Sequence, residues 1–448
     1  MSELPGAWTE VLFDEINSFR SQTIDPSDYP NEVFELYSVP TFPTRKPELL
    51  KGSAIGSTKQ VVTPGDVLVC KINPRINRVW KVMSKTDKRQ IASSEWIVMR
   101  AKGMEPEFLR NFFSSQAFRE TLCEDLTGVG GSLTRAQPKR VSKFKLPIAP
   151  LAEQKRIADK LEAVLGRVDA CRARLDRVPG LLKRFRQSVL AAATSGQLSN
   201  EWRSLHKTSD RSQEIDIGED TIEVPASWQK ATLTDVIDST RPLCYGVVQP
   251  GEEISGGSLL IRVQDMLGGR INTEGLRTIS KDVDAEYKRS RVKIGDLLIS
   301  VVGTIGRTSI VPSNLEANIA RAVARIACRD GIDSRWVNYW LCCDTLQWWL
   351  ASSSKEVARK TLNLSDLENA PVAIPSFPEQ QEIVRRVEAL FAFADRIEAR
   401  LTEARAQVER LTPATLAKAF RGELVPQDPN DEPASAILER LSQNQKSK

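Results

Sequence analysis

The longest regular pattern in the chain is a seam of apolar residues spaced alternately four and three positions apart. It occurs twice, over 157–189 and over 383–415. Each seam continues for more than four heptads, which is typical of coiled-coil helices. Amphipathic helices packed on a globular core are the alternative. The residues that carry the prediction are Ile157, Leu161, Val164, Val168 and Leu175 in the first seam and Ile383, Val387, Leu390, Ile397 and Leu401 in the second.

Prolines mark where these helices begin and where they are interrupted. Pro150 and Pro378 lie at the start of the two segments, where proline ends the preceding strand or loop. Pro179-Gly180 interrupts the first seam, so we expect a kink or a short break there. In the second segment the corresponding proline lies later, at Pro413.

The two helical segments are copies of each other. Ile148–Leu198 matches Ile374–Leu424 at a constant offset of 226 residues. Fainter repeats precede each copy: Gly65–Val69 resembles Gly295–Ile299, and Leu4–Trp8 resembles Val224–Trp228. The chain is therefore a tandem duplication. Two seams of equal length predict an antiparallel helix pair within the chain, if a pseudo-twofold axis relates the halves.

Between the helical segments the pattern changes to short β-branched runs with a few helices. Strands are predicted at 67–72, 96–99, 297–302 and 322–326, and helices at 108–118 and 336–350. The fold class is therefore α/β (α+β), with two mixed domains separated by two long helices. The predicted organisation is a first domain at 1–150, a helical region at 151–200, a linker at 201–222, a second domain at 223–376, a distal helical region at 377–424 and a tail at 425–448. We expect the tail to be solvated, with one short helix.

Composition limits the chemistry. The chain has 41% hydrophobic and 27% charged residues, one histidine and seven cysteines without a CxxC pair. We therefore expect no metal site, no disulfide framework and reduced thiols in the cytoplasm. No stretch has the ~20 uncharged apolar residues of a membrane span, and no secretion signal begins the chain. The net charge of +5 allows a nucleic-acid partner without requiring one.

Sequence signatures of catalysis are missing. There is no GxxxxGK[ST] phosphate loop, no Asn-Pro-Pro-Tyr-like tetrapeptide for an amino-methyltransferase, and no Gly-rich turn for an adenosyl cofactor. The loose spacing of a nuclease carboxylate cluster leaves that possibility open. We therefore expect a chain that is not an enzyme by itself and binds no cofactor.

Positive charge gathers at a few places, where it favours contact with phosphates and base edges. A solvated basic face is the alternative interpretation of each cluster. In the first domain, two clusters flank the glycine-rich segment 128–131, and in the second the basic groups are sparser and accompanied by a polar loop at 245–262. The candidate DNA-binding residues are Lys71, Asn73, Arg75, Asn77, Arg78, Lys81, Arg135, Lys139, Arg140 and Lys143, then Tyr245, Arg262, Arg307, Lys355, Arg359 and Lys360.

Four segments closely resemble the specificity subunit of Type I restriction–modification systems: 65–75, 146–157, 181–193 and 374–383. The resemblance covers essentially the whole chain. It implies two target-recognition domains that each read one half of a bipartite, asymmetric DNA site. It also implies two adenine-methyltransferase subunits and ATP-dependent restriction subunits as partners. S-adenosylmethionine, ATP and magnesium would then be bound by those partners.

The helical segments would determine the distance between the two readers. A helix over 157–189 would be on the order of 50 Å long, somewhat more than one DNA turn of about 34–36 Å. We therefore expect helix length to set an unread spacer. Two alternatives are a structural coiled-coil adaptor without a DNA role and a fused restriction or methylation enzyme with an unrecognised catalytic site.

Overall fold

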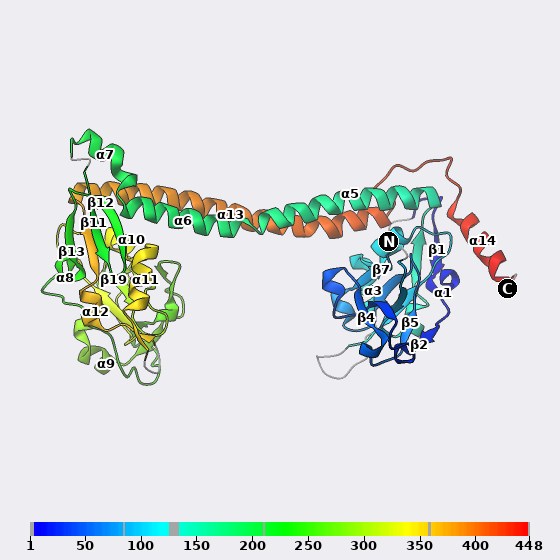
Figure 1. Ribbon diagram of the computed structural model, residues 1–448, viewed down its shortest axis with the longest axis horizontal. Coiled ribbons are helices and arrows are strands. Elements are labelled where there is room, and N and C mark those ends of the chain that lie inside the picture. The colour runs from blue at the N-terminus through cyan, green and yellow to red at the C-terminus, as the bar shows by residue number, and fades with distance from the viewer. Residues whose placement is uncertain (1–3, 84–85, 125–133, 209–210, 357–359, 447–448) are drawn as a thin grey trace. The chain divides into compact units, whose positions relative to one another are not determined.

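The computed structural model describes residues 4–83, 86–124, 134–208, 211–356 and 360–446 (Figure 1). The chain forms two compact units. Unit 1 is built from both ends of the sequence, residues 1–176 and 402–448, whereas unit 2 is the continuous segment 177–401. Each unit contains one mixed domain together with part of the helical repeat.

The mixed domain of unit 1 is built around a small antiparallel sheet. Its order is β7 (Val79–Lys81), β6 (Val67–Cys70), β9 (Trp96–Met99), which confirms the strands predicted near 67–72 and at 96–99. The helices α2 (Pro106–Phe113) and α3 (Gln116–Glu124) contribute Phe108, Phe113 and Phe118 to its core. A second sheet has the order β2 (Thr23–Ile24), β5 (Lys59–Val61), β8 (Arg89–Ala92), β3 (Val33–Tyr37), β4 (Glu48–Lys51).

The mixed domain of unit 2 repeats the first arrangement. Its antiparallel sheet has the order β14 (Cys244–Tyr245), β22 (Val323–Ile326), β19 (Leu297–Ser300), β20 (Thr308–Ile310). The helices α10 (Ser334–Cys342) and α11 (Asp344–Ser352) follow β22, as α2 and α3 follow β9. A second sheet has the order β18 (Arg277–Ile279), β15 (Ser258–Ile261), β21 (Ala317–Ile319).

Strand register establishes the internal repeat residue by residue. In unit 1 the central strand pairs Leu68 with Val98, and in unit 2 it pairs Leu298 with Arg325. The outer strands that lead into the helices also correspond: β1 (Thr9–Leu12) pairs with β10 (Lys145–Ile148), and β13 (Gln229–Thr232) pairs with β25 (Pro371–Ile374). The predicted duplication therefore holds at the level of register.

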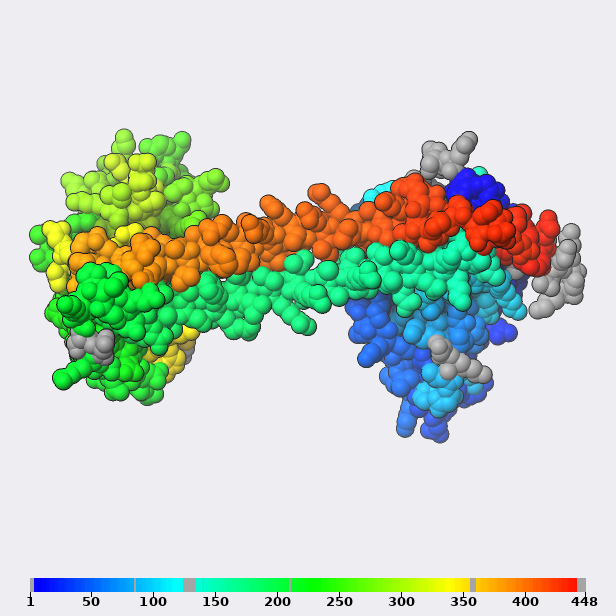
Figure 2. Space-filling model, turned by 90° about the horizontal axis from the view of Figure 1, so that it is seen from above, coloured from blue at the N-terminus to red at the C-terminus, as the bar shows by residue number. Residues whose placement is uncertain are grey.

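In unit 1, α5 (Leu151–Leu175) lies antiparallel to residues 402–420 of α13 (Phe377–Phe420). Arg172 contacts Glu409 at 2.8 Å, and Asp176 contacts Arg405 at 2.9 Å, so numbers rise along one helix as they fall along the other. Figure 2 shows the two helices side by side. Exposed pairs of this kind contribute little stability, but they define the register of the helix pair.

In unit 2, α6 (Val178–Thr194) pairs with residues 377–401 of α13 in the same antiparallel sense. Arg186 contacts both Asp395 at 2.7 Å and Glu398 at 2.9 Å. The predicted short break is present but lies at 176–177, just before Pro179-Gly180, which fall in the first turn of α6. α13 continues through Pro413 without a break.

Burial along the seams shows two kinds of packing. Near the mixed domains the seam residues are fully buried, and Ile157 and Leu161 belong to the core of unit 1 as Ile383 and Val387 belong to that of unit 2. Farther along, half-buried positions such as Val164 and Leu390 are followed by buried ones such as Val168 and Leu401. The buried seam residues are Ile157, Leu161, Val168, Ile383, Val387 and Leu401, and the half-buried ones are Val164, Leu175, Leu390 and Ile397.

The second seam departs from strict heptad spacing at its end. Leu411, expected on the seam, is 46% exposed, whereas Leu416 and Ala419 are buried. The apolar face shifts because this end of α13 packs into the core of unit 1, where the Phe420 ring lies 5.3 Å from that of Phe108.

The segment 201–222 is not the linker expected from the sequence. It contains most of α7 (Asn200–Leu205), the strand β11 (Ser212–Ile217) and the start of its partner β12 (Asp220–Pro225). Ile215 and Ile217 are buried and alternate with exposed acidic residues, the pattern of a half-buried strand. The hairpin therefore belongs to the core of unit 2.

The tail 425–448 is also not simply solvated. The carboxylate of Asp431 pairs with Arg156 at 2.6 Å, and Gln427 donates to Glu153 at 2.6 Å. Ala434 and Ile437, on α14 (Ala434–Lys446), are buried. The predicted short helix is present, and the segment before it is docked on unit 1. Across the described part of the chain, no helix has the length and apolarity needed to cross a membrane.

Candidate nucleic-acid interface

The loop between β6 and β7 has a conformation that few sequences can adopt. Asn73 (φ 47°) and Asn77 (φ 49°) both lie in the left-handed region, which asparagine tolerates better than most residues. Between them Pro74, Arg75 and Ile76 form a 3-10 turn whose tip, Arg75-Ile76, is exposed. Ile72 forms a β-bridge with Arg135, which brings the two predicted basic clusters together.

The equivalent loop of unit 2, between β19 and β20, repeats the two positive-φ positions. Gly303 (φ 78°) and Gly306 (φ 80°) take the places of Asn73 and Asn77. Val302 forms a bridge with Thr361 as Ile72 does with Arg135. An arginine ends each loop: Arg78 and Arg307 each donate to a backbone carbonyl, that of Ile72 at 3.3 Å and that of Val263 at 3.0 Å. The tip is one residue shorter in unit 2.

The basic side chains of the two clusters in unit 1 are not equivalent. Arg75 is exposed, and so are Lys139 and Lys143. Arg135 is 59% exposed, although it also contacts Glu95 at 3.0 Å. Lys81 is different, because it pairs with Glu107 at 2.5 Å. Burial alone would raise the pKa of Glu107, but hydrogen bonds from Lys81 and Arg110 outweigh it and lower that pKa. The carboxylate therefore stays ionised and holds Lys81 against α2.

The two loop asparagines also differ. The Asn77 amide points inward, with Nδ2 donating to the carbonyl of Ser115 at 3.5 Å and Oδ1 buried. The backbone N–H of Asn73 donates to the carbonyl of Thr134, and its half-buried side chain has no hydrogen bond within the described residues. Asn73 is therefore the better candidate for contact with a base edge.

The remaining predicted residues are scattered. Tyr245 is half-buried on the edge strand β14, Arg262 pairs with Asp265 of its own turn at 3.0 Å, and Lys71 is half-buried beside Glu95. Lys355 and Lys360 lie on paired strands, β23 (Lys355–Glu356) and β24 (Lys360–Thr361). Arg140 lies on α4 (Pro138–Val141). Arg359 and the glycine-rich segment 128–131 lie outside the described residues.

The repeated Glu-Gln pair at the start of each long helix fixes its domain. Gln154 accepts from the backbone N–H of Glu105 at 3.0 Å, at the start of α2, and Gln380 accepts from that of Asp333 at 2.8 Å, at the start of α10. The same amides donate to the carbonyls of Ala149 and Pro375. The sequence shows that the Glu-Gln pair is repeated, but it does not show that each glutamine binds the start of α2 or α10.

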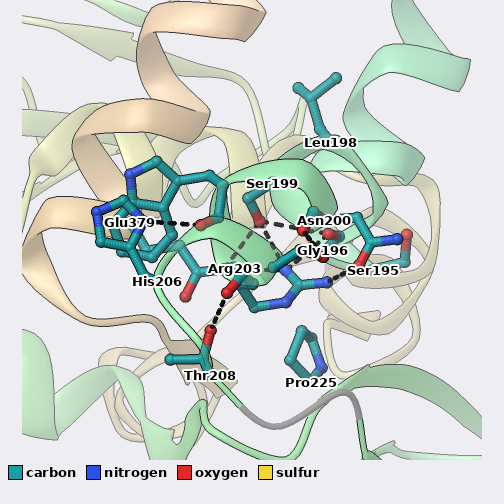
Figure 3. Close-up of polar contacts among 12 residues, drawn as sticks. Ser195, Gly196, Leu198, Ser199, Asn200, Arg203, His206, Thr208, Pro225 and Glu379 are labelled. Atoms are coloured by element: carbon teal, nitrogen blue, oxygen red, sulfur yellow. Dashed lines mark hydrogen bonds and ion pairs between the residues drawn. The ribbon is translucent and has the colours of Figure 1, made fainter.

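The two glutamates of these pairs have different partners. Figure 3 shows the buried carboxylate of Glu379, which accepts hydrogen bonds from Ser199 at 2.8 Å and Arg203 at 2.9 Å. Glu153 instead accepts from the Trp8 indole at 3.0 Å and from Gln427. Burial is the main reason that the pKa of Glu153 is raised.

Sequence reasoning missed one basic run. Lys288, Arg289, Arg291 and Lys293 fall within six residues, a higher density than in either first-domain cluster. Arg325, which is 2% exposed on β22, gave no signal because it lies in an otherwise apolar run, Val323–Ile326.

The fold and its exposed basic loops define a duplicated protein with two mixed α/β domains, each mounted on an antiparallel helix pair. The Type I restriction modification DNA specificity domain family model matches residues 225–405. The chain is 43% identical over 362 residues to the EcoBI specificity subunit of Escherichia coli, covering 78% of this chain and 75% of that protein. It is 32% identical to the StySPI specificity subunit of Salmonella potsdam, covering 76% of this chain and 72% of that protein. The chain belongs to the family of Type I restriction enzyme specificity subunits, the DNA-recognition subunits of these complexes, which are themselves non-catalytic.

Two solved structures share the fold. One, from a study of complex assembly and conformational transition of the type I restriction–modification system, has a TM-score of 0.71 at 22% identity and covers 95% of this chain and 100% of that chain. The other, the HsdS subunit of Thermoanaerobacter tengcongensis, has a TM-score of 0.62 at 23% identity and covers 94% of this chain and 98% of that chain. At these identities the likeness supports the fold and not the DNA sequence that is read.

Proposed function

We propose that each mixed domain reads one half of a bipartite, asymmetric DNA site. The observation that supports this most directly is the pair of loops at 71–78 and 301–307. They share two positive-φ positions and a terminal arginine, but they differ in length and in most of the side chains at the tip. A common scaffold with unlike tips is suited to two unlike half-sites. Arg75 has no counterpart in unit 2 and is exposed at its tip, so it is the first candidate for a base contact.

We further propose that the paired helices carry two adenine-methyltransferase subunits and, in the full complex, ATP-dependent restriction subunits. S-adenosylmethionine, ATP and magnesium would be bound by those partners, and the chain would act in the cytoplasm, where the DNA is. Within this assembly the chain would contribute binding energy, orientation and the length of the unread spacer.

Methylome sequencing tests this function. Cells that express the chain with its methyltransferase partner should acquire one bipartite methyl-adenine motif. Replacing Arg75 with alanine should relax one half-site and leave the other intact, since Arg75 belongs to unit 1 alone. If the chain is a structural adaptor without a DNA role, the cells should acquire no such motif and replacing Arg75 should change nothing. Methyl transfer by the isolated chain would instead support a fused enzyme.

A further inference from the structure

Unit 2 contains a cationic recess that includes none of the candidate DNA-binding residues, although residues 257–259 of the polar loop 245–262 line part of it. It is a cavity of about 860 Å³ between β22, β15 and the segment 288–293. The lining contains only two carboxylates, Asp284 and Glu316. Its six cations are Arg241, Lys288, Arg289, Arg291, Lys293 and Arg325.

Arg325 is buried in this recess without a counter-charge. Its side chain is 2% exposed. One terminal nitrogen donates to the carbonyl of Pro242 at 2.9 Å and lies 3.4 Å from the sulfur of Cys244, while Nε has no partner. No carboxylate among the described residues pairs with it. Burying a charge in this way is costly unless an opposite charge compensates it.

The fold does not require this arginine. By strand register the equivalent residue of unit 1 is Val98, which packs in an apolar cluster with Trp80 and Trp96. The same position is therefore apolar in one half of the protein and cationic in the other. Arg325 is better explained by a ligand than by the requirements of the sheet.

Three of the five surrounding cations are available to that ligand. Arg241 and Arg291 are held by Asp296 and Asp284. Lys288, Arg289 and Lys293 are exposed and form no ion pair within the described residues. We propose that this recess binds a phosphate group, an anion that both arginine forks and lysines recognise. At about 860 Å³ it has room for a phosphate together with the group that carries it.

The phosphate could belong to the DNA strand or to a free phosphate compound. Only the first source rests on the proposed function. The experiment therefore uses two probes on the full-length chain, inorganic pyrophosphate and duplex DNA. The test variant combines Lys288→Ala with Arg289→Ala, whose side chains are exposed. Lys230→Ala, an exposed lysine on β13 away from the recess, is the matched control.

Calorimetry should show pyrophosphate binding to the wild-type chain and to the control, and binding about tenfold weaker or worse to the double variant. In parallel, the double variant should lower the salt slope of DNA affinity by about two if the DNA strand supplies the phosphate. An unchanged slope with lost pyrophosphate binding assigns the site to a free phosphate compound. An unchanged slope with no difference in pyrophosphate binding overturns the proposal.

Arg325→Val gives a second, independent readout. Without phosphate the variant should be at least as heat-stable as the wild type, because a buried charge is removed. Pyrophosphate should raise the melting temperature of the wild type and not that of the variant. Equal stabilisation of both chains would contradict the site. A wild-type chain that binds pyrophosphate but not DNA would refute the DNA-reading function while leaving the phosphate site standing.

Discussion

The side-chain oxygen of Gln380 accepts the backbone N–H of Asp333, 47 residues earlier in the chain, at 2.8 Å. The same amide donates to Pro375, so a single side chain joins the start of α13, the end of β25 and the start of α10. Gln154 makes the equivalent set of contacts in unit 1. The repeated pair is therefore a joint between helix and domain.

Replacing Gln380 with leucine should destabilise unit 2 by roughly 1–3 kcal/mol, since the N–H of Asp333 and the carbonyl of Pro375 lose their partner in a buried place. Urea denaturation measures the loss. Gln381→Leu, at the exposed neighbouring position, should change stability little. Equal losses of stability in both variants would contradict a specific role for the Gln380 hydrogen bonds.

The two buried glutamates should respond differently to neutralisation. Glu379→Gln leaves Arg203 buried without a counter-charge, which should cost about 3–5 kcal/mol. Glu153→Gln removes a charge that has no direct cation, and the Gln427 amide can turn to accept from the new one, so the change should be within about 1 kcal/mol. Hydrogen exchange, followed separately in the two units, distinguishes these results. A larger loss in unit 1 would reverse the assignment.

The lowered pKa of Glu382 should make the stability of unit 2 depend on pH under acidic conditions. Hydrogen bonds from Arg385 and Arg386 lower its pKa to about 2 from 4.5. A carboxyl whose pKa is depressed in the folded state contributes stability above its unfolded pKa, and that contribution is lost as pH falls toward the folded value. The stability difference between wild type and Glu382→Gln should therefore be constant above pH 4.5 and shrink toward pH 2. Urea denaturation of both chains across this pH range measures the difference.

The loop asparagines allow a test of base reading that leaves the backbone intact. Both have positive φ, and unit 2 has glycine at both places. Asn73→Gly therefore removes an amide without straining the loop, and it should alter the preferred base in one half-site. Asn77→Gly removes an amide that faces Ser115, so the methylated motif should stay the same. A changed motif in the second variant alone would show that the assignment is reversed.

Any insertion that is meant to lengthen the spacer must preserve the register of the helix pair. Because Asp176 contacts Arg405, one added heptad after Leu175 needs a matching heptad before Arg405 to keep the pairing. The double insertion should lengthen the unread spacer by roughly one to three base pairs. Methylome sequencing would detect it. An unchanged spacer in a well-folded variant would refute the hypothesis that helix length sets the spacer.

Periodicity was enough to predict the long helices and the central strands, because both depend on local apolar spacing. It failed where tertiary contacts decide. Lys81 belongs to a basic stretch, yet α2 brings Glu107 against it, and Asn77 is turned inward by the start of α3. The hairpin at 212–225 has a two-residue alternation, but the polar residues around it favour a linker. No pattern within Val323–Ile326 indicates that Arg325 faces a cavity.

The discontinuity of unit 1 has a consequence for synthesis on the ribosome. Unit 2 occupies one uninterrupted stretch and can fold as soon as residue 401 has emerged. The first part of unit 1 is synthesised before unit 2, but its core is completed only by residues 402–448. Ile157 and Phe108 therefore lack their packing partners Leu416 and Phe420 until the whole of unit 2 has been translated. Nascent chains expose apolar surface during such intervals and depend on chaperones for that time. The half of the protein that is made first is therefore the half that is completed last.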